Sequence, residues 1–399
     1  MYQPSDKILK KYADVLVKYA LNNLKGIRKG DVVLCQVEEP AKPLLKHLQR
    51  AVLEAGGHPL LQLIPSGMSR QFYELANEKQ LTFFPAKFLK ARMDTIDHSV
   101  TVVAEDDLHE LDGVNPKRIM RQSLTMKPYV NWHNEKENKG KFTWTLALYG
   151  TEAMAKEAGM SLEQYWQQII RACYLDHADP IKRWGQTMDE LHRVRDKLDS
   201  LKIQQLHIKA PGTDLIVGLG KDRQWMAAKG RNIPTYELFI SPDCRKTEGH
   251  ITFNQSLYHY GSLITGVQLW FKNGKVVKAK AKKGEKLLKE MIRTKGANMV
   301  GEYSLTDGRV SRITKFMADT LYDENRGGKY GNTHLALGRA YQDSYPGNVA
   351  KVSKAQWKAM GYNDSVVHTD IVSTTNRTVT ATLANDKELV IYKEGKFTI

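Results

Sequence analysis

Five residues in the second half of the chain offer the oxygen and nitrogen donors that divalent cations bind. They are two glutamates, two histidines and an aspartate: Glu237, Glu302, His334, His368 and Asp370. Neutral imidazole together with carboxylate suits zinc, cobalt or manganese better than calcium or a metal that prefers thiolates. These residue types therefore predict a centre for two divalent cations and, with it, a metal-assisted hydrolase.

His368 and Asp370 lie in a short apolar run, Ser365-Val-Val-His-Thr-Asp-Ile-Val372, that is flanked by turn residues. The run is typical of a strand, on which residues i and i+2 point to the same face. We expect the two side chains to project side by side.

His334 opens a second run, His334-Leu-Ala-Leu-Gly-Arg-Ala-Tyr341. If this run is helical, Tyr341 lies two turns beyond His334 on the same side of the helix. A tyrosine there would stand close to the same centre.

Ordinary structural roles remain open for each of these residues. A single histidine in an apolar run is commonly a hydrogen-bonded core residue, and most glutamates are solvated. The short motifs that identify a metal site by themselves are absent: His109-Glu110 is followed by Gly113 where His-Glu-x-x-His needs a histidine, and no Cys-x-x-Cys occurs.

Ordered segments across almost the whole chain resemble a known family. They are Tyr12-Ala-Asp-Val-Leu-Val17, residues 29–33, 158–165 and 172–176, Asn232-Ile-Pro-Thr-Tyr-Glu237, Thr247-Glu-Gly249, Gly301-Glu302, Tyr322-Asp-Glu-Asn325, residues 334–341 and His368-Thr-Asp370. In their order and coverage they resemble the aminopeptidase T / aminopeptidase S family of two-domain metallo-aminopeptidases.

The resemblance implies a di-metal centre with Glu237, Glu302, His334, His368 and Asp370 as ligands and Tyr341 beside them. It further implies release of N-terminal residues from peptides by a metal-activated water, and a homodimer. Zinc, cobalt or manganese is expected in the centre, and magnesium is a further candidate.

Within that centre Glu302 is expected to bridge the two ions and to take part in catalysis with Tyr341. Glu237 and His334 are assigned to one ion, and His368 and Asp370 to the other. Tyr341 would ligate weakly or donate a hydrogen bond to the oxyanion. Glu324 is a further carboxylate that could carry a proton, although an ordinary helix-turn or salt-bridge role is preferred for it.

Two features depart from the family pattern. Tyr236 stands where many relatives carry a second acidic residue. Residues 326–333 look longer than the usual link between Asp-Glu-Asn and the histidine, and three of these eight residues are glycine, which predicts a mobile loop beside the site.

Length and composition fit this class. A chain of 399 residues exceeds one ordinary core and suggests two domains. No apolar run approaches the ~20 residues of a membrane helix, and the N-terminus has no signal-peptide core. Three widely spaced cysteines argue against a disulfide framework and favour the cytoplasm.

The N-terminal half alternates helices with strands. Helices are expected at residues 6–25 and 44–55, and strands at 32–37, 59–64 and 100–104. Strands separated by helices predict a mostly parallel sheet. Neither Gly-x-Gly-x-x-Gly after the first strand nor a P-loop occurs, so a nucleotide site is unsupported.

Two helices, at about 161–175 and 180–198, extend this half to a boundary near residue 202. Ser161-Leu-Glu-Gln164 matches a capping box, and Pro180 suits a first turn. Short alternating strands follow, with a hairpin at Asn273-Gly274. The fold class is therefore an N-terminal α/β domain (1–202) and a β-rich, barrel-like α+β domain (203–399) that carries the metal site.

The chain carries a formal charge of +16, with 60 Lys and Arg against 44 Asp and Glu. Lysines at 272, 275, 278, 280, 282 and 283 could follow a phosphate backbone. However, Lys278, Lys280 and Lys282 alternate with apolar residues, as on the solvated face of a hairpin. Nucleic-acid binding remains an alternative function, as does hydrolysis of a non-peptide amide by the same centre.

Overall fold

A computed structural model of the chain describes residues 2–259 and 262–399. The chain divides into two compact units. Unit 1 comprises residues 1–187, 228–235 and 316–321, and unit 2 comprises residues 188–227, 236–315 and 322–399. Compactness does not test whether residues 1–202 and 203–399 fold separately, so that division stays a prediction. No helix within the described residues is both long and apolar enough to cross a membrane.

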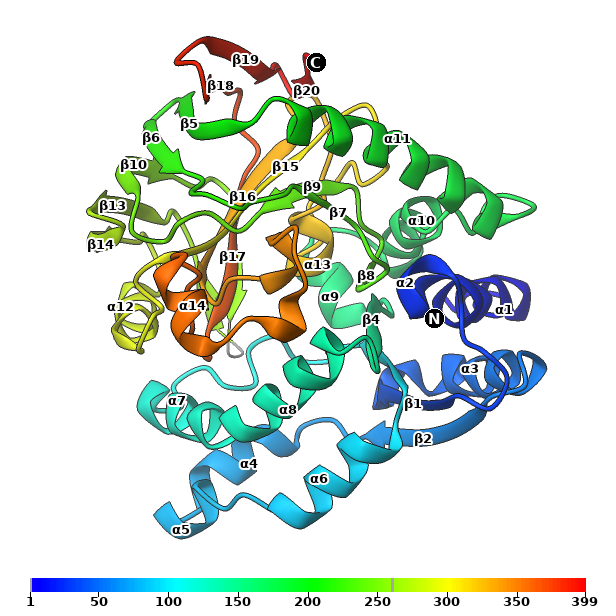
Figure 1. Cartoon of the computed structure of the whole chain (residues 1–399). Coiled ribbons are helices and arrows are strands. Elements are labelled where there is room, and N and C mark those ends of the chain that lie inside the picture. The colour runs from blue at the N-terminus through cyan, green and yellow to red at the C-terminus, as the bar shows by residue number, and fades with distance from the viewer. Residues whose placement is uncertain (1, 260–261) are drawn as a thin grey trace. The chain divides into compact units, whose positions relative to one another are not determined.

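Unit 1 is built on a five-stranded sheet, here called sheet A, with strand order β2-β1-β3-β4-β8 (Figure 1). All of its neighbouring strands run parallel, which confirms the prediction from the alternation of helices and strands. The strands are β1 (Val32–Glu38), β2 (His58–Ile64), β3 (His98–Val103), β4 (Thr143–Leu148) and β8 (Asn232–Ile233).

Helices separate these strands along the chain, since parallel neighbours need a crossover connection. Ser161 begins α10 with the predicted capping box, accepting from the Gln164 amide while the Gln164 side chain accepts from the Ser161 amide. The helices are α3 (Lys42–Glu54), α4 (Met68–Leu75), α5 (Glu78–Leu81), α6 (Ala86–Thr95), α7 (Pro116–Thr125), α8 (Lys127–Asn138), α9 (Glu152–Glu157), α10 (Leu162–Ala172) and α11 (Pro180–Ser200), which continues into unit 2.

The first helix is shorter than the predicted span 6–25. It comprises α1 (Asp6–Val15), a π-helical turn (Leu16–Ala20) and the short segment α2 (Leu21–Leu24). Asn22 and Asn23 within α2 have φ of 53° and 55°. Asparagine tolerates this left-handed region better than most residues, and the Asn22 amide donates to Thr143 Oγ1 at 2.8 Å instead of continuing the helix.

Unit 2 contains an eight-stranded antiparallel sheet, sheet B, with order β14-β13-β10-β6-β5-β18-β19-β20. Its two end strands do not pair with each other in the described part of the chain, so the expectation of a barrel-like second half is wrong and the sheet stays open. Its strands are β5 (Ile203–Ala210), β6 (Thr213–Gly218), β10 (Thr247–Thr252), β13 (Gln268–Lys272), β14 (Lys275–Lys280), β18 (Thr378–Leu383), β19 (Glu388–Lys393) and β20 (Lys396–Phe397).

The predicted hairpin at Asn273-Gly274 joins β13 to β14, and both turn residues have positive φ. The predicted apolar face of β14 is wrong at Val277, which is 63% exposed. A bulge shifts the register, so that Val276 opposes Phe271 and Lys278 opposes Trp270. The extra residue of a bulge is left unpaired, and here Val277 points outward.

A second antiparallel sheet of unit 2, sheet C, has the order β17-β16-β15-β9-β7 (Figure 1). Its strands are β7 (Met226–Ala227), β9 (Glu237–Ile240), β15 (Val300–Thr306), β16 (Asn332–Gly338) and β17 (His368–Ser373). The remaining elements are the hairpin β11 (Leu257–His259) and β12 (Ser262–Ile264) and the helices α12 (Glu285–Arg293), α13 (Thr320–Asp323) and α14 (Lys354–Ala359). Residues of β9, β15 and β16 are almost all buried, so sheet C is the core element of unit 2.

Candidate metal centre

The five predicted ligands come from four neighbouring strands of sheet C. Directly opposed residues of an antiparallel pair point to the same face. Ala336 of β16 opposes both Glu302 of β15 and Asp370 of β17, while Gly338 opposes His368. His334 opposes Ser304, which lies two residues from Glu302 on β15. The ligands of these three strands therefore share one face, and the small Ala336 and Gly338 leave room between them.

Glu237 reaches the same face from β9, opposite Thr306 of β15. Its Oε2 accepts a hydrogen bond from Ser304 Oγ at 2.7 Å, which fixes the carboxylate toward His334. Thus the fourth strand, distant in sequence, completes the group.

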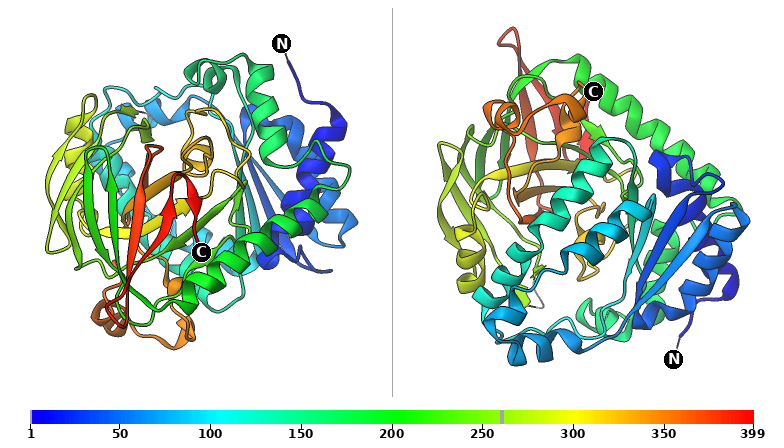
Figure 2. Two further views of the ribbon diagram at one scale, coloured as in Figure 1. Left: turned by 90° about the horizontal axis from the view of Figure 1, so that it is seen from above. Right: turned by 60° about the horizontal axis from the view of Figure 1, so that its bottom comes forward.

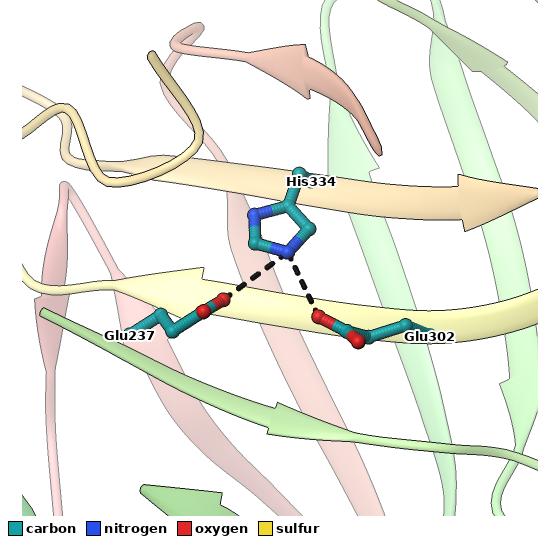
Figure 3. Close-up of side chains that lie close together, drawn as sticks. All are labelled: Glu237, Glu302 and His334. Atoms are coloured by element: carbon teal, nitrogen blue, oxygen red, sulfur yellow. Dashed lines mark hydrogen bonds and ion pairs between the residues drawn. The ribbon is translucent and has the colours of Figure 1, made fainter. Parts of the chain in front are cut away.

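Three of these side chains form a tight cluster. His334 Nε2 lies 3.1 Å from Glu237 Oε2 and 3.0 Å from Glu302 Oε1 (Figure 3). One ligand atom from each residue lies within 4.8 Å of the others, and all three residues are buried. Donors at this spacing can each lie about 2.0–2.2 Å from one shared ion.

His368 and Asp370 extend the cluster along β17. His368 Nε2 lies 3.5 Å from Asp370 Oδ1 and 3.7 Å from Glu302 Oε2. Asp370 Oδ1 also lies 3.6 Å from His334 Nε2. Glu302 thus faces both histidines, one through each carboxylate oxygen, which is the placement that a bridging ligand needs.

Both imidazoles are oriented by backbone carbonyls. His368 Nδ1 lies 2.7 Å from the Arg339 carbonyl oxygen, and His334 Nδ1 lies 3.3 Å from that of Glu324. When Nδ1 carries the proton and donates it there, the lone pair of Nε2 faces the carboxylates. Such hydrogen bonds commonly orient metal-bound histidines.

Burial and mutual charge shift the pKa values of this group. Burial, with Glu237 and Asp370 adding to it, raises the pKa of Glu302 to about 7. Burial opposes the charge of Asp370, but His368 and His334 outweigh it and hold its pKa at about 2. Burial likewise opposes the charge of His334, yet the carboxylate of Glu237, followed by those of Glu302 and Asp370, raises its pKa well above the usual range.

The run 334–341 is not a helix. His334 lies in strand β16, and Tyr341 follows the strand at the start of a short 3-10 turn. Tyr341 nevertheless lies beside the group, because its ring packs against that of His368 with 4.8 Å between the centroids. Its amide donates to Ser241 Oγ at 2.9 Å, which fixes the backbone there.

Glu324 is a carboxylate that the sequence interpretation placed in an ordinary role. It is buried, and burial, followed by the charges of Asp370 and Glu237, raises its pKa well above the usual range. Asn325 donates to its Oε1 at 3.4 Å, and Asn325 Oδ1 accepts from the amide of Tyr236. Glu324 therefore adds a fourth carboxylate to the electrostatics of the centre and is a further candidate ligand or proton carrier.

The donor set fits divalent cations. It combines imidazole nitrogens with carboxylate oxygens, which is the chemistry of zinc, cobalt and manganese sites. Asp370 Oδ1 is buried and makes no hydrogen bond within the described residues, although two imidazoles lie 3.5–3.6 Å away. A buried oxygen in this state is suited to a cation. Fold and donor set together define a metal-dependent enzyme.

Comparison with known proteins agrees with that class. The family profile described as Thermophilic metalloprotease (M29) matches residues 5–397, so the chain belongs to this family of metalloproteases, which use divalent metal. Aminopeptidase PepS of Streptococcus thermophilus is 27% identical over 415 residues and covers 98% of each chain. Aminopeptidase T of Thermus aquaticus is 26% identical over 417 residues, again with 98% of each chain covered.

A solved structure, described as wild-type AmpT from Thermus thermophilus, has the same fold. The TM-score is 0.81 at 24% sequence identity, and the match covers 98% of this chain and 99% of that one. A match of this extent shows that the chain has the same mixed α/β fold.

Proposed function

We propose that this chain is a metallo-aminopeptidase that releases N-terminal residues from peptides. The observation that carries the proposal is the buried convergence of Glu237, Glu302 and His334 on one face of sheet C, in a chain of the M29 metalloprotease family. The relatives described above are named aminopeptidases, which supports exopeptidase rather than endopeptidase action.

Two divalent cations are proposed for the centre, with zinc, cobalt or manganese preferred and magnesium as a further candidate. Glu302 would bridge them, since its two oxygens face different histidines. Glu237 and His334 would serve one ion, and His368 and Asp370 the other. A cation pair held there would activate a shared water and polarise the scissile carbonyl.

The chain's own residues would bind and orient the substrate. A free α-amine at the N-terminus of a peptide would coordinate one of the ions or meet a carboxylate of the centre, which would favour exopeptidase over endopeptidase action. Tyr341, held against His368, would direct its hydroxyl to the developing oxyanion. Glu302 or Glu324 would receive the proton of the attacking water, because both are buried carboxyl groups of unit 2 close to the proposed ligands.

We place the enzyme in the cytoplasm and propose that it acts as a homodimer. Cys35, Cys173 and Cys244 are free and buried, which suits a reducing compartment. The named relatives support neither the amide hydrolase with a non-peptide substrate nor the nucleic-acid-binding function.

Hydrolysis of aminoacyl-p-nitroanilides tests the function directly. We expect turnover that a chelator abolishes and that zinc, cobalt or manganese restores. N-acetylated versions of the same substrates should be refractory, because the acetyl group removes the charged amine. Equal cleavage of free and acetylated substrates would contradict an aminopeptidase, and turnover unaffected by chelation would contradict a metalloenzyme.

A further inference from the structure

Arg339 follows strand β16 and contacts the centre through both its backbone and its side chain. Strand β16 runs beside β17, and Gly338 at its end opposes His368 at the start of β17 (Figure 2). The Arg339 carbonyl oxygen lies 2.7 Å from His368 Nδ1. The guanidinium carbon of the same residue lies over the Tyr341 ring, 5.3 Å from its centroid. One residue therefore contacts both the proposed ligand His368 and the proposed oxyanion donor Tyr341.

The backbone of this segment is held at three successive residues. The amides of Arg339 and Ala340 donate to carbonyl oxygens within residues 363–367, at 2.7 and 2.9 Å. The Tyr341 amide donates to Ser241 Oγ at 2.9 Å. Because the main chain is fixed, the position of the Tyr341 hydroxyl depends on the side-chain torsions that orient its ring.

Three groups pack around the Tyr341 ring. The ring centroids of His368 and Phe239 lie 4.8 and 5.8 Å from that of Tyr341, and the Arg339 guanidinium is the third group. Tyr341 is only partly buried, so its ring depends on these neighbours for its orientation. A cation within about 6 Å of a ring centroid is attracted by the negative face of the π-system. The guanidinium therefore adds a contact that depends on charge and on the direction of the ring.

The charge of Arg339 also acts on the centre itself. Burial lowers the pKa of His368, the carboxylates of Asp370 and Glu302 raise it above the usual value, and the charge of Arg339 opposes those carboxylates. A guanidinium keeps its charge in proteins, since it is not deprotonated there. Arg339 thus places a fixed positive charge beside the ring of Tyr341.

We propose that Arg339 is a positioning residue whose guanidinium holds the Tyr341 ring so that the hydroxyl points to the oxyanion of the reaction. This inference rests on the proposed aminopeptidase function and extends it to a residue outside the ligand set. The oxyanion forms only after water attacks the carbonyl carbon. The contact should therefore act on kcat and not on substrate binding.

Two variants of Arg339 separate the charge from the length of the side chain. Arg339→Met keeps a long side chain without the charge and should lower kcat on an aminoacyl-p-nitroanilide by about 5- to 30-fold, as the loss of one cation–π contact predicts. KM and the metal content should not change. Arg339→Lys keeps a cation and should restore most of kcat. A raised KM with unchanged kcat would assign the guanidinium to substrate binding and overturn the positioning role.

Arg183→Met is the matched control. The Arg183 guanidinium carbon also lies 5.3 Å from the centroid of a tyrosine ring, that of Tyr174 in unit 1, and Arg183 is partly buried like Arg339. Its substitution removes the same type of contact and should leave kcat and KM unchanged. Equal losses of kcat in Arg183→Met and Arg339→Met would show a general effect on the fold and contradict the proposal.

A double-mutant cycle shows whether Arg339 acts through Tyr341. Tyr341→Phe keeps an aromatic ring under the guanidinium but removes the hydroxyl. Arg339→Met should lower kcat in the wild-type background, whereas in the Tyr341→Phe background it should change kcat by less than about twofold. The full loss of kcat in both backgrounds would mean that Arg339 acts by another route, and the proposal would then be wrong.

The position of the ring can be determined without any substrate. In crystals of the full chain, the Tyr341 side chain should have one rotamer in the wild type and in Arg339→Lys, and a different rotamer or several rotamers in Arg339→Met. An unchanged ring in Arg339→Met would overturn the proposal whether or not peptides are cleaved. A ring that moves in Arg339→Met, in a protein whose wild type cleaves no peptide, would count against the proposed function and keep the positioning contact.

Discussion

His334 lies between the two carboxylates of the tightest part of the centre, and its protonation state decides what the centre can bind. In the metal-free protein its imidazole is cationic, because three carboxylates lie 3.0–3.6 Å from Nε2. A cation takes the place of that proton, since the same carboxylates favour positive charge at the same position. Metal binding therefore competes with protons here, and affinity rises with pH.

Removing a single ligand should remove the activity. We expect His368→Ala and Glu302→Gln each to lower kcat/KM by more than about 100-fold and to lower the metal content below two equivalents per chain, since even supporting residues of such sites contribute 10–100-fold. His250→Ala, on strand β10 of sheet B, is the control and should keep both. Unchanged hydrolysis in His368→Ala would remove that residue from the centre.

Ala336 offers a test of the shared face that leaves every ligand in place. It is fully buried and opposes Glu302 and Asp370 on the neighbouring strands. Ala336→Leu should fill the space between the ligands and abolish metal binding. Added metal should then no longer raise the melting temperature. Ala336→Ser, which adds one atom, should still bind metal in calorimetry. Normal metal content in Ala336→Leu would contradict the placement of the ions on this face.

The residue types of the centre could be predicted from the sequence, whereas their grouping followed only from the family resemblance. Imidazole and carboxylate donors, together with the family resemblance, identified Glu237, Glu302 and His334, which the structure brings together. Glu324 was assigned an ordinary role because nothing in the sequence distinguishes a buried glutamate from a solvated one. Only the fold shows that it is buried among other carboxylates.

At the scale of elements, the local sequence around His334 did not decide between helix and strand. A short apolar run is compatible with both, and periodicity alone cannot separate them. Pairing with β15 on one side and β17 on the other decides it, which is a long-range effect. The same holds for Val277, whose outward position results from a bulge against β13 rather than from its own strand pattern.

Gly301 should be essential for aligning Glu302. It lies at the register shift of β15 between Val300 and Glu302, and a Cβ there would meet the Arg339 carbonyl oxygen at 2.3 Å. That carbonyl also orients His368. We expect Gly301→Ala to weaken metal binding at least tenfold and to destabilise the fold by about 1–3 kcal/mol, as overpacking does.

The control for this prediction is Gly30→Ala. Gly30 has φ of +89° but nothing within 4 Å of an added Cβ, so its substitution tests backbone strain without a clash. It should cost about 1 kcal/mol in urea unfolding and leave metal affinity unchanged. Equal metal affinity in Gly301→Ala and wild type would show that the bulge does not align the ligand.

At the scale of the whole molecule, the architecture followed from patterns that extend over many residues. Alternating helices and strands predicted the parallel sheet A, and the Asn-Gly turn predicted the β13–β14 hairpin. Whether sheet B closes depends on strand order, which the local sequence does not encode. The charge of +16 is likewise a property of the whole chain, and the lysines of β14 protect a sheet edge without requiring a polyanion partner.

The stability of the metal-free protein should fall as pH rises through neutrality. The pKa of Glu302 is about 7 in the folded protein and 4.5 ordinarily, so the folded state binds more protons than the unfolded chain between these values, and the free energy of unfolding decreases with pH there. His334 and His368 act in the same direction. Their pKa values are raised above 6.5, so the stability they contribute is present below pH 6.5 and is lost above it.

Asp370 has the opposite sign, but its contribution is lost only on acidification from its ordinary pKa of 3.8 toward about 2. Between pH 5 and 8 the melting temperature of chelator-treated protein should therefore decrease. Saturating zinc or manganese should oppose this trend, because ligation requires deprotonated groups and so gains with pH. Glu302→Gln without metal, which lacks one of the titrating groups, should show a shallower decrease. A metal-free melting temperature that rises over this range would mean that these carboxylates and imidazoles do not share one buried centre.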